Sequence, residues 1–129
     1  MLFRSIHGVL SLLALTSLIA QVQPFAVDVP GAKEIPALVQ KADEGDAEAA
    51  FKLGFAYDVA ATVPRDYVAA LKWYSKAAEK DHAKAQFHLG MLYHFGRGVP
   101  KDVHKAAELY RRSAEQGNDM AQLDRKSVV

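Results

Sequence analysis

The feature that most constrains the fold of this chain is an internal repeat with a period of 36 residues. When residues 45–80 are laid over residues 81–116 without a gap, thirteen positions are identical, and most of them are small, aromatic or turn-forming. The identical pairs are Ala47/Ala83, Ala49/Ala85, Phe51/Phe87, Leu53/Leu89, Gly54/Gly90, Tyr57/Tyr93, Val63/Val99, Pro64/Pro100, Asp66/Asp102, Ala70/Ala106, Tyr74/Tyr110, Ala78/Ala114 and Glu79/Glu115. Leu38 and Leu123 continue the register as half-repeats on either side. Repeats of this length are typical of architectures in which each unit packs only against its neighbours.

Each repeat predicts two helices, because apolar residues recur at the spacing of one helix face. The six expected helices cover 34–44, 46–59, 66–80, 82–95, 102–116 and 118–126. Asp46, Asp66 and Asp102 each stand where a helix needs an N-cap. Gly117 follows the last full helix, at a position that favours a left-handed residue. The expected fold class is therefore all-α.

Glycine recurs inside both first helices, at Gly54 and Gly90. Because glycine there costs about 1 kcal/mol relative to alanine, we expect these positions to permit close backbone approach of a neighbouring helix. Gly98 lies in a turn instead. We therefore expect Gly90→Val to destabilise the fold more than Gly98→Ala, which would only strain a turn.

The first twenty residues have the pattern of a secretory signal peptide. Arg4 lies near the start, an uncharged run begins at Val9, and the small Ala20 ends it. The run is too short to span a bilayer, which needs about 20 apolar residues; the alternative is a buried core helix. We expect cleavage after Ala20 to leave no stable membrane anchor, and residues 21–33 to form an extended, poorly ordered linker. Export without cysteine favours a bacterial periplasm or secretion into the medium.

The composition excludes several classes of function. The chain has 129 residues, of which 16 are basic and 15 acidic, so nothing favours binding of nucleic acid through bulk charge. The absence of cysteine excludes disulfides, thiolate metal sites and a thiol nucleophile. No two of the histidines have the spacing of a helical metal site, and no strained turn presents a serine. We expect no metal, no cofactor, no catalytic residues and hence no enzyme.

The motif Ala-x-Ala-x-Phe-x-Leu-Gly-x-x-Tyr, followed in repeat 2 by Gly96-Arg97-Gly98-Val99-Pro100-Lys101-Asp102, resembles the Sel1-like repeat, a relative of the tetratricopeptide repeat. The resemblance covers about 34–124. It implies an α-α solenoid of antiparallel helix pairs that binds other molecules, usually proteins, and its bacterial members are often exported. We place the repeat domain at 34–126 and a tail at 127–129.

Two departures from the family pattern carry expectations. Repeat 1 has Ala60 and Thr62 in place of the turn glycines of repeat 2, so helix 46–59 must end differently or accept the strain of a left-handed alanine. Near the C-terminus, Arg125 and Lys126 stand where the pattern has leucine and glycine. This end is either a polar terminal cap or the end of a truncated gene product.

The arc of the first helices opposite their packing residues is the predicted binding surface. Its apolar anchors are Phe55, Met91 and Phe95, and the residues expected to orient a partner are Lys52, Lys84 and His88. Apolar strips with polar rims are typical of binding sites; the alternative is that Phe55 and Phe95 fill gaps between helices.

The sequence thus predicts an exported, non-enzymatic scaffold that binds a protein or peptide through its concave face. Its partner is not nucleic acid, and self-association is possible. The alternatives are a module that binds a small molecule or a cell-wall glycan, and a truncated family member with no independent activity.

Overall fold

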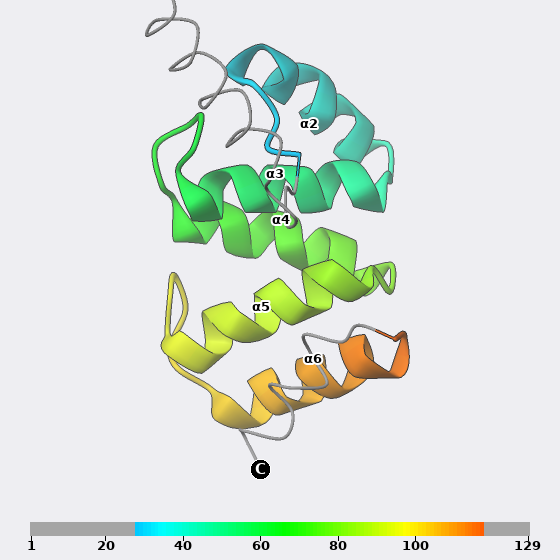
Figure 1. Cartoon of the computed structure of the whole chain (residues 1–129), viewed down its shortest axis with the longest axis vertical. Helices are drawn as coiled ribbons and strands as arrows, with labels where there is room; N and C mark the ends of the chain where they lie inside the picture. The colour runs from blue at the N-terminus through cyan, green and yellow to red at the C-terminus, as the bar shows by residue number, and fades with distance from the viewer. Residues whose placement is uncertain (1–27, 118–129) are drawn as a thin grey trace, which may run out of the picture.

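The computed structural model describes residues 28–117, and within them every regular element is a helix (Figure 1). A short 3-10 helix, η1 (Ala32–Glu34), leads into five α-helices. These are α2 (Ile35–Asp43), α3 (Ala47–Val59), α4 (Tyr67–Glu79), α5 (Ala83–Phe95) and α6 (Val103–Glu115). The all-α prediction is confirmed. The expected signal peptide and the expected helix at 118–126 lie outside the described residues.

The helices stack in chain order along the long axis of the molecule (Figure 1). The most extensive contacts join α3 to α4 and α5 to α6, which are the two helices of each repeat. The α2–α3 and α4–α5 contacts link successive units, and α3 also touches α5. Helix α2 ends 36 residues before α4 does, so it is the second helix of the leading half-repeat. The predicted α-α solenoid is confirmed.

The repeated glycines lie against tyrosine rings. A Cβ atom at Gly54 would stand 2.5 Å from Cδ1 of Tyr74, and one at Gly90 would stand 2.8 Å from Cε1 of Tyr110. Both tyrosines are fully buried. A neighbouring helix does approach closely at both glycines, but the approaching group is the tyrosine ring of the second helix in the same repeat, not the backbone that was expected.

Side chains cap each of the helices α3 to α6. The predicted caps Asp46, Asp66 and Asp102 accept hydrogen bonds from Ala49 N at 3.1 Å, Ala69 N at 3.0 Å and Lys105 N at 3.0 Å. For α5 the cap is a histidine, whose Nδ1 accepts from Ala85 N at 3.2 Å. These bonds satisfy backbone donors that have no partner inside the helix.

Of the two expected endings for helix α3, the structure shows the one with a left-handed alanine. Ala60 ends the helix in the left-handed conformation with φ of 56°, where Gly96 ends α5 with φ of 64°. Two residues further, the Thr62 hydroxyl donates to the carbonyl of Pro30 at 2.8 Å. The substitution of glycine by threonine therefore attaches the N-terminal lead-in to the turn of repeat 1.

The linker predicted for residues 21–33 is wrong over its last residues. Pro30 is fully buried and Ala32–Glu34 form η1. These residues occupy the place in the leading half-repeat that the start of α4 occupies in repeat 1. The packed domain therefore begins near Pro30 rather than at residue 34.

The turn at Gly98 is also tighter than expected. A Cβ atom there would lie 2.7 Å from the carbonyl carbon of Tyr67 and 2.8 Å from its oxygen, and φ is +71°. The obstacle is backbone at the start of α4, which cannot rotate away. The expectation that Gly98→Ala would only strain a turn is therefore wrong, because Gly98 is a contact between repeats.

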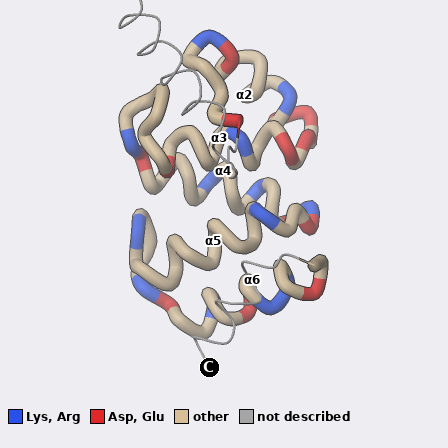
Figure 2. The backbone as a smooth tube through the Cα atoms, in the orientation of Figure 1, with Lys and Arg blue, Asp and Glu red and all other residues tan. Residues whose placement is uncertain are grey.

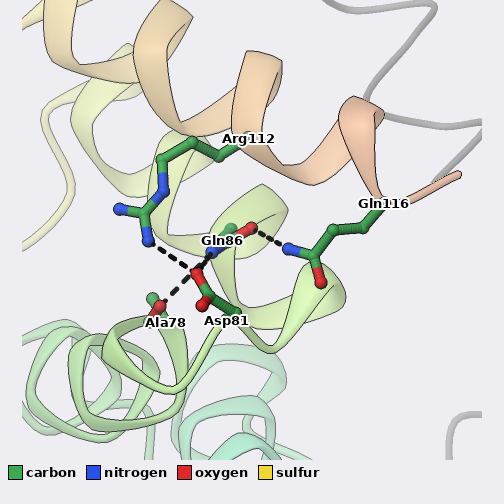
Figure 3. A network of polar contacts seen from close by, with 5 residues as sticks. All are labelled: Ala78, Asp81, Gln86, Arg112 and Gln116. Atoms are coloured by element: carbon green, nitrogen blue, oxygen red, sulfur yellow. Dashed lines mark hydrogen bonds and ion pairs between the residues drawn. The ribbon is translucent and has the colours of Figure 1, made fainter.

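A polar network links the two full repeats (Figure 3). Gln86 is fully buried, and its Nε2 donates to Ala78 O and to Asp81 Oδ1, both at 3.3 Å. Gln116 Nε2 donates to Gln86 Oε1 at 2.7 Å, and Arg112 Nη2 lies 3.0 Å from Asp81 Oδ1. The buried amide of Gln86 is therefore satisfied by groups from α4, the following turn and the end of α6.

Candidate functional site

The six residues of the predicted binding surface lie on α3 and α5, the first helices of the two repeats. Lys84 and Phe95 are exposed, and the other four (Lys52, Phe55, His88 and Met91) are half-buried. The two helices touch, so the structure brings residues of both repeats together on neighbouring elements. Their role in binding stays a prediction.

His88 lies among aromatic rings rather than on an exposed rim. Its ring centroid is 5.3 Å from that of Tyr74 in a stacked arrangement, 5.6 Å from that of Phe55 edge-on, and 5.7 Å from that of Phe51. Burial, with a smaller contribution from the Lys84 charge, lowers the pKa of His88 to about 4. His88 is therefore neutral near pH 7 and joins the two repeats by packing.

A partly buried hydrogen bond next to His88 was missed by the sequence reasoning. The Tyr74 hydroxyl donates to Asp58 Oδ2 at 3.1 Å, and His88 Nδ1 lies 3.9 Å from the same oxygen. Burial raises the pKa of Asp58, and the hydrogen bond from Tyr74 opposes that rise. Burial and the Asp58 charge raise the pKa of Tyr74, so its hydroxyl keeps its proton and acts as a donor.

The repeat alignment contained a signal for this pair. In repeat 2, His94 takes the place of Asp58, and its Nδ1 shares a hydrogen bond of 3.2 Å with the Tyr110 hydroxyl. Each buried tyrosine of a second helix thus reaches a polar residue near the end of the preceding first helix. This arrangement holds the helices of a repeat together.

The three apolar anchors differ in exposure. Phe55 packs against the core cluster that contains Phe51, and Met91 packs against the cluster that contains Phe87. Phe95 is 56% exposed. The alternative of gap-filling therefore describes the packing of Phe55 and Met91, whereas more than half of Phe95 is open to solvent.

The two lysines differ in a similar way. Lys52 Nζ lies 3.6 Å from Asp28 Oδ2, so the lead-in segment contacts the predicted surface on α3. Lys84 is exposed on α5 and forms no ion pair within residues 28–117. The part of the predicted surface that is open to a partner is consequently centred on α5.

A row of stacked side chains, also missed from sequence, lies where first helices turn into second helices. The Arg97 guanidinium carbon is 5.0 Å from the Phe95 ring centroid and 5.7 Å from that of Tyr67. On the Tyr67 ring, the Arg65 guanidinium carbon is 5.5 Å from the centroid. We call these four residues the arginine–aromatic ladder. Arg97 aligns with an alanine in repeat 1, so the repeat pattern gave no signal for it.

A pocket of about 300 Å³ lies at the opposite ends of the helices, where α2 turns into α3 beside the end of α4. Its charged lining includes Asp43, Glu79, Lys76 and Lys80, and Asp43 Oδ1 pairs with Lys76 Nζ at 2.9 Å. Within residues 28–117, no group of three or more histidine, aspartate or glutamate side chains is arranged to hold a metal ion. Nor is any helix of that part of the chain long and apolar enough to cross a membrane.

Comparison with known structures identifies relatives of this arrangement. The chain is similar to a Sel1 repeat protein from Oxalobacter formigenes, with 38% sequence identity over 70% of this chain and a TM-score of 0.67. It is also similar to c5321, a protective antigen of uropathogenic Escherichia coli strains with an SLR fold, with 33% identity over 73% of this chain and a TM-score of 0.69. The matches cover 36% of the first structure and 20% of the second. No curated protein sequence matches the chain.

The match to a family model has the same 36-residue period as the sequence and the fold. The Sel1 repeat model matches residues 47–82 and 83–118, which are two consecutive units of the 36-residue period and more than half of the chain. The units begin two residues later than the repeats defined above, at the first residues of α3 and α5. The chain belongs to the Sel1 repeat family.

Proposed function

We propose that this protein is a non-enzymatic adaptor that binds a protein or peptide through the surface of α3 and α5. Sel1 repeats generally mediate protein–protein interactions, and members of the family are generally non-catalytic scaffolds. The observation that carries the proposal is the exposure of Phe95, one helical turn after the half-buried Met91. Residues four apart share one helix face, so Met91 and Phe95 lie on one face of α5, the helix that also carries the exposed Lys84.

We propose further that the adaptor works outside the cytoplasm, in a bacterial periplasm or after secretion. The support is the pattern of residues 1–20, with Arg4 before an uncharged apolar run and Ala20 at its end. N-terminal sequencing of native protein tests this part, and a mature start near Gln21 is the expected result. Native protein that begins at Met1 contradicts it.

The binding surface is tested by capturing partners from the native compartment with immobilised protein. Phe95→Ser should remove most of the captured partner, because binding energy concentrates in a few aromatic anchors. The matched control is Glu108→Ser on the exposed face of α6, which should capture as the wild type does. Equal capture by Phe95→Ser contradicts the proposed surface. If no protein is captured and sugars raise the melting temperature, the glycan-binding alternative is favoured.

A further inference from the structure

The arginine–aromatic ladder joins the two repeats at one edge of the solenoid. The turns that contain Arg65 and Arg97 both lie on the same side of the helix stack, and basic positions mark them in Figure 2. Arg97 spans the edge, because its guanidinium contacts Phe95 of its own repeat and Tyr67 of the preceding one. The His94 ring extends the row by stacking on Phe95 at 4.6 Å.

The guanidinium groups of the ladder keep hydrogen-bonding capacity. Within residues 28–117, neither Arg65 nor Arg97 forms an ion pair. Arg65 uses only Nε, which donates to Asp58 O at 3.0 Å. A guanidinium that stacks on an aromatic ring retains its fork of N–H donors for a carboxylate. The nearby Asp66 and Asp102 cap helices rather than pair with these arginines. The half-buried Asp58 carboxylate lies near enough for both arginine charges to lower its pKa against the effect of burial, but it forms no ion pair with either of them.

Apolar side chains are exposed at the same edge. Val68 is 65% exposed, Phe95 56% and Val103 40%, and all three lie within one turn of the junction between a first and a second helix. The edge therefore combines apolar groups that are open to contact with two arginines that form no ion pair within residues 28–117. Charge complementarity requires a ligand with the opposite character, namely carboxylates next to apolar side chains.

We infer that the arginine–aromatic ladder binds an acidic peptide segment of the partner. A carboxylate of the segment pairs with Arg97, and an adjacent apolar side chain packs against the exposed part of Phe95. This inference rests on the proposed function and adds to it the chemistry of the partner. A peptide suits the edge better than a polynucleotide, because the exposed Val68 and Val103 offer apolar contacts to peptide side chains, whereas two arginines are few for a string of phosphates.

The test uses an array of synthetic peptides in which Asp or Glu flanks Phe or Leu, paired with the same peptides carrying Asn or Gln. The full chain should bind members of the acidic set and not their amide counterparts. Arg97→Gln should weaken that binding about tenfold, the effect of losing a charge-assisted hydrogen bond. Arg97→Lys should recover only part of it, since an ammonium keeps the charge but lacks the planar fork.

The matched control is Arg111→Gln. Arg111 is an exposed arginine on α6 that pairs with Glu115 at 2.6 Å, and its removal should leave peptide binding unchanged. Melting curves of all variants by circular dichroism separate loss of binding from loss of fold. If Arg97→Gln has a lowered melting temperature, peptide binding by Arg97→Lys and Phe95→Ser is compared with that of the wild type instead.

Three outcomes overturn the inference. They are binding to no acidic peptide in the array, equal binding by Arg97→Gln, and binding of a dT12 oligonucleotide by the ladder in place of the peptides. The proposed function fails separately. If wild type and Arg97→Gln capture the native partner equally but Phe95→Ser does not capture it, the ladder inference is wrong and the adaptor role stands. If Phe95→Ser captures the partner as well as wild type does, both the ladder inference and the proposed function are wrong.

Discussion

The ring of Tyr74 fills the space that a side chain at Gly54 would occupy, with Cδ1 only 2.5 Å from the position of a Cβ atom. Alanine is the better helix former by about 1 kcal/mol, but overpacking a buried contact costs about 1–3 kcal/mol. Because the Tyr74 ring is fully buried and cannot swing into solvent, overpacking should exceed the gain in helix propensity.

We therefore predict that Gly54→Ala destabilises the protein by about 1 kcal/mol or more. Urea unfolding followed by circular dichroism measures the change. The double variant Gly54→Ala/Tyr74→Leu should lose less than the two single variants together, since a smaller side chain admits the new methyl group. A higher melting temperature for Gly54→Ala alone would contradict this packing.

Gly98 and Gly117 give a second, matched prediction. Both have positive φ, but a Cβ atom at Gly98 meets the backbone of Tyr67 whereas one at Gly117 meets nothing within 4 Å. Gly117→Ala should cost about 1–2 kcal/mol, the strain of a left-handed alanine. Gly98→Ala should cost a further 1–3 kcal/mol, roughly, for the contact between repeats. Equal unfolding midpoints for the two variants would show that the turn at Gly98 relaxes without cost.

The buried amide of Gln86 leads to a third prediction. Gln116→Ala should cost about 1–3 kcal/mol, because it removes the donor to the fully buried Gln86 Oε1 and leaves that oxygen without this partner. Gln86→Leu should cost less, because the Ala78 carbonyl still accepts from Asp81 N at 3.0 Å and the exposed Gln116 amide can bond to water. Chemical denaturation of both variants tests the order, and a larger loss for Gln86→Leu would refute it.

Most of the fold could be predicted from the sequence, because a 36-residue repeat with two amphipathic helices leaves few ways to bury the apolar faces of both helices. Helix ends and caps followed from local chemistry, as at Asp66. Two misjudged positions, His88 and Gly98, involve groups in a neighbouring repeat. Helical spacing placed His88 on the arc opposite the packing residues of α5, but the contact between α3 and α5 lays that arc against Phe51 on α3. Gly98 meets Tyr67, which is 31 residues earlier in the chain, and the arc of a single helix contains no information about such contacts.

The candidate site was less predictable than the fold for a related reason. Phe95 could be proposed as an anchor because it lies on the outward arc of one helix. Arg97 has no counterpart in repeat 1, so a search for recurring residues passed over it. Its significance arises only when Tyr67 and Phe95 lie on either side of it, which is a property of the stacked repeats.

The packing of His88 predicts how stability depends on pH. Its pKa is lowered to about 4 in the folded protein, whereas the unfolded chain binds the same proton near pH 6.5. Folding stability from this group is therefore fully present above pH 6.5 and falls as the pH drops toward 4. With His88 only 21% exposed, the difference of about 2.5 pH units corresponds to a loss of about 3 kcal/mol.

Two carboxylates also contribute to the dependence on pH. Lys76 lowers the pKa of Asp43, so stability from Asp43 is lost as the pH falls below its ordinary value of 3.8. Burial raises the pKa of Asp58, so its contribution has the opposite sign and declines as the pH rises above 3.8. The part of the slope between pH 6.5 and 5 that depends on the His88 ring is therefore isolated by a variant that removes this ring.

Urea unfolding at a series of pH values measures that slope. His88→Gln should flatten it, because glutamine does not titrate, even if the variant is less stable at every pH. His104→Gln is the control, since His104 is exposed at the start of α6 and should leave the slope as it is. If His88→Gln keeps the full slope, or if wild-type stability does not fall between pH 6.5 and 5, the ring of His88 is not held neutral by the rings around it, and the account of how α3 and α5 join would have to change.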